Sequence, residues 1–233
     1  MAYYIIGGII LVLLIVVFSA RKRIQTIYAK YMKVSNKADI TGKQLALAGK
    51  EYLKLEGLQF SLIEGKMTDG YSHKYKTLFI SDEVANTASL ASVAIVAHEL
   101  GHAMQDFGND RLYHLTHIFN RITRFTNKFI LPCLIVGIGF LLFEFELNIS
   151  YGLLYTSLGL FCLHLLLKVL TIPMERNASH RALKFLKQYK IVSNSEHNKA
   201  RKLLRVAGQT YITALFDGIF ITFNKTKRFF YKK

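Results

Sequence analysis

Apolar runs alternate with mixed polar stretches along the chain, and this pattern divides it into membrane-like and soluble parts. The apolar runs cover Tyr3–Ala20, Phe129–Leu142 and Tyr151–Ile172. Because a membrane helix needs about 20 apolar residues, we expect the second run to extend into its flanks. The residues from Ile24 to Asn127 lack such a run and are typical of a soluble part.

The charges beside the apolar runs predict an orientation. Basic clusters follow the first run, precede the second and follow the third: Arg21–Arg23, Arg121, Arg124, Lys128, Arg176, Arg181. Acidic Glu144 and Glu146 lie between the second and third runs. A secretory signal would carry its charges before the apolar run, so the first run indicates an uncleaved anchor. The positive-inside rule then places the basic flanks in the cytoplasm.

We therefore predict a multi-pass cell-membrane protein with its chemistry on the cytoplasmic side. An apolar stretch near the C-terminus, residues 207–223, contains Asp217 and is predicted to pack on the protein or lie in the membrane interface. The predicted parts are a transmembrane anchor at 3–20, a cytoplasmic part at 21–127, a transmembrane hairpin at 128–172, and cytoplasmic or membrane-associated helices at 173–233.

Within the soluble part, the pattern predicts helices and short strands. Thr41 opens an amphipathic helix that stops near Gly57, and strands are expected at Leu58–Glu64 and Thr77–Ser81. An exposed edge on the second strand would pair with an extended substrate peptide. A plain structural hairpin, joined through a polar turn, explains the same pattern, and the sequence leaves both interpretations open.

Composition agrees with a membrane protein. The 233 residues are 52% hydrophobic, with a mean hydropathy of +0.24 and a net charge of +16. The Lys and Arg residues cluster beside apolar runs, which favours anionic lipid headgroups over nucleic acid as their partner. Cys133 and Cys162 lie inside apolar runs and are typical of small core residues rather than zinc ligands.

The stretch from Ser89 to Phe107 has helical periodicity and contains the motif H-E-x-x-H. On a helix, positions i and i+4 share a face, so His98 and His102 can bind one metal ion. Zn²⁺ accepts imidazole nitrogen and leaves a position for water in catalytic sites. Glu99 is then the expected general base. Gly101 allows another element to approach this helix closely. We predict a zinc metalloprotease with one catalytic ion.

A third protein ligand is needed, and three residues are candidates. His114 and His117 follow the motif closely, but on the same continuing helix they would have to bend back through it. Glu175 follows the predicted hairpin, which returns it to the membrane side of His98 and His102. The topology therefore favours Glu175.

At these residues the chain resembles a known family. The run Val96–Gln105 together with Pro173–Ser179 is similar to the putative neutral zinc metallopeptidases of the YugP type, which are bacterial integral-membrane proteins. The order of elements also resembles the HtpX-type membrane gluzincins. The resemblance implies an α-helical membrane protein with a gluzincin-like α+β peptidase part, in which His98, His102 and Glu175 hold zinc and Glu99 is the base.

The resemblance also has departures. Ala178 matches the gluzincin E-x-x-A-D pattern, but Ser179 stands where aspartate is usual. The segment Asp69–His73 departs from the D-H-Y-D-P pattern of YugP-like chains. Tyr71, His73 and Tyr155 could stabilise an oxyanion, and the spacing selects none of them. A zinc-binding membrane adaptor without turnover is the alternative function. The sequence gives neither substrate, pathway nor oligomeric state.

Overall fold

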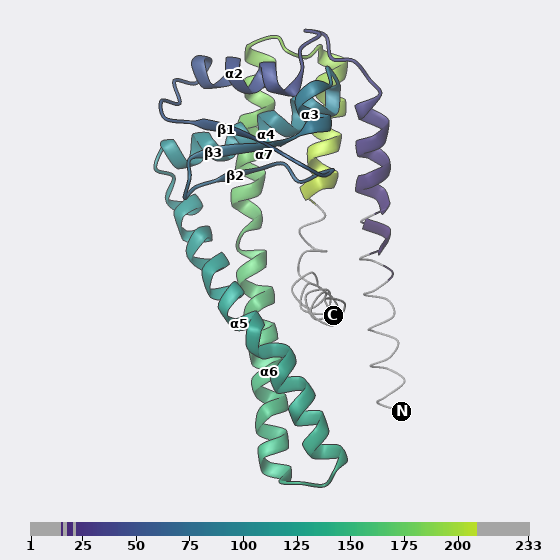
Figure 1. Ribbon diagram of the computed structural model, residues 1–233, viewed down its shortest axis with the longest axis vertical. Helices are drawn as coiled ribbons and strands as arrows, with labels where there is room; N and C mark the ends of the chain where they lie inside the picture. The colour runs from purple at the N-terminus through teal and green to yellow at the C-terminus, as the bar shows by residue number, and fades with distance from the viewer. Residues whose placement is uncertain (1–14, 16–17, 21, 209–233) are drawn as a thin grey trace. The chain divides into compact units, whose positions relative to one another are not determined.

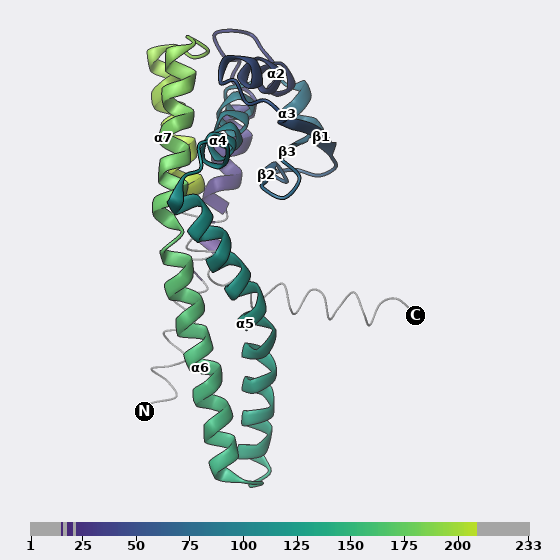
Figure 2. The ribbon, with the colours of Figure 1, turned by 90° about the vertical axis from the view of Figure 1, so that its left-hand side faces the viewer.

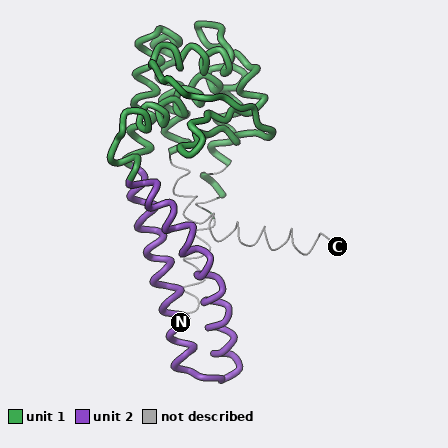
Figure 3. The backbone as a smooth tube through the Cα atoms, turned by 60° about the vertical axis from the view of Figure 1, so that its left-hand side comes forward, with its two compact units in different colours: residues 1–114, 173–210 green, residues 115–172, 211–233 purple. Residues whose placement is uncertain are grey.

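The computed structural model describes residues 15, 18–20 and 22–208. The chain is mostly helical and divides into two compact units (Figure 3). The first unit comprises the described residues up to His114 and from Pro173 onwards, and the second unit comprises Leu115–Ile172. The predicted anchor at 3–20 and the segment at 207–223 lie for the most part outside the described residues.

The first unit contains a small three-stranded sheet (Figure 1). Its strands are β1 (Gln59–Ile63), β2 (Gly70–Ser72) and β3 (Thr77–Ser81), in the order β1-β3-β2. β1 pairs parallel to β3, and β2 pairs antiparallel to it. The predicted strand segments are confirmed. The predicted free edge at Thr77–Ser81 is wrong, because β2 and β1 flank β3 on either side.

The strand β2 was missed because it has only three residues and carries no alternating pattern. Its insertion also rules out the simple hairpin, since the segments expected to pair as neighbours run parallel. The turn residue Asp69 has a structural role: its carboxylate accepts hydrogen bonds from the backbone N–H and the hydroxyl of Ser81, at 2.8 and 3.0 Å.

Helices pack around this sheet and bury the core. They are α2 (Gly42–Tyr52), α3 (Asp82–Asn86), α4 (Leu90–Phe107) and α7 (Ile172–Gln188), with further helical residues at 22–32 and 194–208. α2 begins at Thr41 through a capping box with Gln44, as the sequence predicts, but ends at Tyr52, before Gly57. Leu45 and Leu100 are fully buried in the core of this unit.

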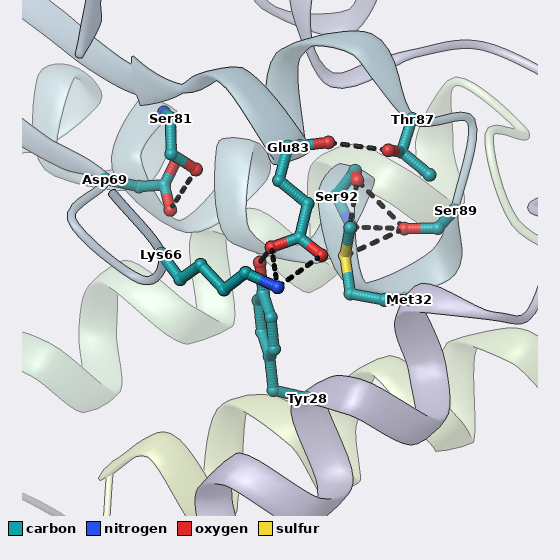
Figure 4. A network of polar contacts seen from close by, with 9 residues as sticks. All are labelled: Tyr28, Met32, Lys66, Asp69, Ser81, Glu83, Thr87, Ser89 and Ser92. Atoms are coloured by element: carbon teal, nitrogen blue, oxygen red, sulfur yellow. Dashed lines mark hydrogen bonds and ion pairs between the residues drawn. The ribbon is translucent and has the colours of Figure 1, made fainter. Parts of the chain in front are cut away.

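The start of α4 is held by polar contacts with the preceding elements (Figure 4). Ser89 caps the helix by accepting the backbone N–H of Ser92, and its hydroxyl contacts the sulfur of Met32. Nearby, the Glu83 carboxylate accepts the Tyr28 hydroxyl at 3.3 Å. Because Ser89 satisfies a free N–H of the first turn, these contacts fix where the helix begins.

α5 and α6 form a helical hairpin (Figures 1 and 2), all of which except Arg111–His114 lies in the second unit. α5 covers Arg111–Leu142 and α6 covers Leu147–Val169, so the helix of the second apolar run, Phe129–Leu142, does extend upstream as predicted. Small polar groups join them: Ser150 donates to the Gly137 carbonyl at 2.7 Å and Ser157 to the Ile130 carbonyl at 2.9 Å. Such bonds are common between membrane helices.

Two helical stretches are long and apolar enough to cross a membrane, by length and composition alone. They are Arg111–Leu142 and Leu147–Gln188, and in each only 17% of the most apolar window is buried.

Lys168 donates from Nζ to the Asn120 side chain at 3.0 Å within the hairpin. Cys133 and Cys162 are free thiols, but Cys162 is exposed on its unit, so the prediction of a core position is wrong for it.

Candidate metal centre

Three side chains of the first unit converge on a small triangle. His102 Nε2 lies 3.2 Å from His98 Nε2 and 3.2 Å from Glu175 Oε2, and His98 Nε2 lies 3.4 Å from the same oxygen. Donors bound tetrahedrally at about 2.05 Å lie about 3.3 Å apart, so this spacing fits one zinc ion without rearrangement. The three side chains are 12–15% exposed, which leaves a path for water.

The close contact of α4 with α7 creates this triangle. A β-carbon on Gly101 would lie 2.5 Å from the Ala178 carbonyl oxygen, so only glycine permits the contact. The predicted close approach at Gly101 is confirmed. His98 and His102 project from α4, and Glu175 projects from the first turn of α7.

Gln105 links the two helices one turn beyond His102. Its Nε2 donates to the Met174 carbonyl at 2.9 Å and to the Asn177 side chain at 3.0 Å. The same Asn177 oxygen accepts Nε of Arg181 at 2.7 Å. Gln105 is buried, and it holds α7 with Glu175 facing the histidines. Sequence reasoning did not assign Gln105 or Asn177 a role. The sequence pattern that could have identified them is their spacing: Gln105 lies three residues after His102, and Asn177 lies two residues after Glu175.

Each histidine is also held from behind through Nδ1. His102 Nδ1 lies 3.1 Å from Gln105 Oε1, and His98 Nδ1 lies 3.2 Å from Ser179 Oγ. An amide oxygen can only accept, so His102 donates from Nδ1 to Gln105 and directs Nε2 to the triangle. Ser179 thus contacts His98 with a hydroxyl at the position where the gluzincin pattern has a carboxylate.

The electrostatics of the triangle suit a cation. Burial lowers the pKa of His102, but its hydrogen bond with Glu175 and the charges of Glu175 and Glu99 outweigh burial and raise that pKa to about 9. Burial raises the pKa of Glu175, yet hydrogen bonds and charge from both histidines hold it far below its ordinary value. Two carboxylates therefore favour positive charge at this point, and a metal ion entering it would displace a proton.

The other residues singled out from the sequence lie beside the triangle or away from it. Glu99 is half-buried on α4 next to His98 and contributes to the field at His102. Neither His114 nor His117 joins the triangle, among the residues that the structure describes. The chain turns at Gly108–Asp110 with Asn109 at φ +50°, so α4 and α5 are separate helices and the predicted continuous helix is wrong.

Tyr71 and His73 instead belong to a second cluster centred on Asp106, which lies one helical turn after His102. The Asp106 carboxylate accepts the Tyr71 hydroxyl at 2.6 Å and contacts His73 Nδ1 at 2.7 Å and Lys76 Nζ at 2.7 Å. Burial raises the pKa of Asp106, but the bonds from Lys76, Tyr71 and His73 outweigh it and hold this pKa below its usual range. We call Tyr71, His73, Lys76, Asp106 and His114 the Asp106 cluster.

These contacts leave the oxyanion-stabilising role unassigned. The Tyr71 hydroxyl is bonded to Asp106, and Tyr155 is 71% exposed in the other unit. Tyr113, which sequence reasoning missed, lies with its ring centroid 6.2 Å from that of His102. Burial and then the charges of Asp106, Glu99 and Glu175 raise the pKa of its phenol, so it stays protonated beside the triangle.

The chain is similar to known proteins over most of its length. Residues 4–223 match the family described as putative neutral zinc metallopeptidases. The chain is 28% identical over 206 residues to the putative membrane protease YugP of Bacillus subtilis (strain 168), and the match covers 87% of each chain. No solved structure matches significantly. The family match spans most of the chain and includes both helices of the triangle, so this chain belongs to the family of putative neutral zinc metallopeptidases.

Proposed function

We propose that the protein is a zinc-dependent endopeptidase of the gluzincin type, with His98, His102 and Glu175 as zinc ligands and Glu99 as the catalytic base. The observation that carries the proposal is the triangle of donor atoms, with sides of 3.2, 3.2 and 3.4 Å. Those sides match the separation of tetrahedral zinc ligands. The family match supports zinc and peptidase chemistry at a coarser level.

The chain's own residues supply the rest of the reaction. Zinc bound here would polarise the scissile carbonyl and bring the pKa of its water to about 7. Glu99 takes a proton from the attacking water and then delivers it to the leaving amine. Gln105 and Ser179 hold the two imidazoles through Nδ1, so that both Nε2 lone pairs stay directed at one point.

A substrate strand needs a free sheet edge near α4, and β2 has one. β2 is the last strand of the sheet order, packs against α4, and contacts it through Tyr71 and Asp106. An extended peptide paired along β2 would gain backbone hydrogen bonds beside the metal centre. We therefore place the substrate at β2 rather than at the covered strand β3. The substrate class would be proteins or peptides near the membrane.

Turnover tests this proposal against the zinc-binding adaptor. Full-length protein in detergent is assayed on a panel of membrane proteins, and zinc is measured in the same samples. Glu99→Gln should keep its zinc and fold but lose about 10²–10⁴-fold in rate, because only the proton transfer is removed. Glu83→Gln, a glutamate away from the triangle on α3, is the matched control and should keep the wild-type rate. A wild-type rate in Glu99→Gln would overturn the mechanism, and zinc without turnover in wild type would favour the adaptor.

We also propose that α5 and α6 cross the membrane, with the metal centre on the cytoplasmic side near anionic headgroups. Three observations support this proposal. The helical stretches Arg111–Leu142 and Leu147–Gln188 are long and apolar, and basic residues flank the apolar runs. The similar protein YugP is named a putative membrane protease. The exposed apolar surface of α5 and α6 would then contact lipid.

Single cysteines at Asn109 and Asn148 test the orientation. In a background free of Cys133 and Cys162, an impermeant thiol reagent on intact cells should label position 148 and should label position 109 only after lysis. The reverse labelling pattern would place the metal centre outside the cytoplasm and remove the basis for cytoplasmic substrates. Activity of each cysteine variant serves as the control for folding.

A further inference from the structure

The Asp106 cluster contains a second set of metal-binding groups. One ring nitrogen each of His73 and His114 and a carboxylate oxygen of Asp106 lie within 4.8 Å of one another. The Asp106 side chain is only 1% exposed. Two imidazoles and a carboxylate are a donor set that binds zinc. Tetrahedral donors lie about 3.3 Å apart, so no pair of these donor atoms has to close by more than about 1.5 Å.

His114 provides an independent observation. Its Nε2 is buried and has no hydrogen-bond partner among the residues that the structure describes. A buried nitrogen without a partner costs free energy, so such atoms usually have a role or a missing ligand. The ring of His114 stands edge-on to that of His73, with 5.6 Å between centroids. The turn at Gly108–Asp110 brings this histidine back beside Asp106.

Lys76 already balances the Asp106 charge. Its Nζ lies 2.7 Å from Asp106 Oδ2 and 3.5 Å from His73 Nδ1, where an incoming cation would lie. The Lys76 side chain is 42% exposed, so its ammonium can move into water at low cost. A divalent ion would replace one cation with another, and Asp106 would never be left buried without a counter-charge.

We propose that His73, Asp106 and His114 form a second divalent-metal site, selective for zinc-class ions, in which the metal and the Lys76 ammonium compete for Asp106. The competition makes this site weaker than the triangle. An ion here would join the segment between β2 and β3 to α4 and the start of α5. Because Asp106 lies at the i+4 position from His102, that ion would stiffen the wall of the metal centre.

The test uses zinc alone and the full-length protein in detergent, without an activity readout. In the double variant His98→Ala, His102→Ala, which removes two donors of the triangle, isothermal titration with Zn²⁺ should still show one ion per chain. Adding His114→Ala should abolish that binding, whereas adding His117→Ala, the matched histidine one turn later on α5, should leave it unchanged. Adding Lys76→Met should tighten it about tenfold, since a charge-assisted bond no longer competes.

A second measurement covers the case in which the double variant does not fold. Wild-type protein freed of metal should take up two zinc ions, one tightly and one weakly, and His114→Ala should take up one. A single ion in wild type and in Lys76→Met would overturn the proposal. The proposal would also be overturned if the His114→Ala protein still bound the second, weakly held zinc ion. Because turnover is not measured, a failed peptidase assay would not affect this result.

Discussion

The triangle and the Asp106 cluster lie one turn apart on α4 and use the same chemical groups, two imidazoles and one carboxylate. In the triangle, Glu175 Oε2 lies 3.2–3.4 Å from both imidazole nitrogens. In the cluster, an ammonium and a phenol already bind the carboxylate. Under the two proposals above, this donor set would bind a metal ion tightly in the triangle and more weakly in the Asp106 cluster, where Lys76 competes for the carboxylate.

The surroundings of the carboxylate therefore matter as much as the ligands. Glu175 has two imidazoles as partners, so an entering metal ion would displace only an imidazole proton and no ammonium group. At Asp106 the Lys76 ammonium must first leave. The groups that contact Nδ1 of the imidazoles differ as well. Ser179 and Gln105 hold the triangle histidines through Nδ1, whereas the His73 Nδ1 contacts Asp106 itself.

The largest expected effect separates the two sites by metal content. Glu175→Ala should lose the zinc that wild type retains through desalting, as completely as His98→Ala, because two imidazoles alone do not form a closed protein site. His114→Ala should retain this ion in full. Elemental analysis of the desalted proteins measures the difference. Stoichiometric zinc in Glu175→Ala would contradict the ligand assignment.

A smaller effect is expected from the residues behind the triangle. Ser179→Ala removes the hydroxyl that contacts His98 Nδ1, and such substitutions typically cost 10–100-fold in metal affinity. We expect a loss near tenfold, since a hydroxyl is a weaker partner than a carboxylate. Competition with a zinc-binding dye measures it.

Ser179→Asp, which restores the gluzincin pattern, is the matched variant and should bind zinc at least as tightly as wild type. Unchanged affinity in Ser179→Ala would mean that the hydroxyl does not orient His98, and the position would then be structural. This test has no counterpart in the Asp106 cluster. There, Nδ1 of His73 contacts the Asp106 carboxylate itself, so no separate residue lies behind the imidazole at that atom.

The same comparison shows what the sequence could predict. His98 and His102 lie on one helix, so their spacing fixes their geometry, and Glu175 follows from the order of the apolar runs. The Asp106 cluster combines the β2–β3 segment, α4 and the start of α5, and no spacing rule links them. Its formation depends on the turn at Gly108–Asp110, where the helix is predicted to continue.

The strand pairing could not be predicted from the sequence, for a related reason. Strand segments at Gln59–Ile63 and Thr77–Ser81 are visible as short apolar runs, but pairing is a property of the whole fold. The three residues of β2 gain their strand conformation from β3 and from the Tyr71–Asp106 contact, not from their own pattern. The edge strands of the sheet are therefore β1 and β2 rather than β3, and the Asp106 cluster begins at β2.

The smallest expected effect tests whether the Asp106 cluster holds the β2 segment on α4 without any metal. Tyr71→Phe removes a 2.6 Å hydrogen bond to a buried carboxylate, and a bond to a charged group contributes about 1.5–3 kcal/mol. Lys76 and His73 continue to bind Asp106, so we expect a loss of stability of about 1 kcal/mol, seen as a lower unfolding temperature of metal-free protein in detergent. Tyr189→Phe removes an exposed hydrogen bond to the Tyr52 carbonyl and should cost only a few tenths of a kcal/mol. Equal effects of the two variants would mean that the buried contact does not fasten β2 to α4, because an exposed phenol with water as an alternative partner would then contribute as much as one bonded to Asp106.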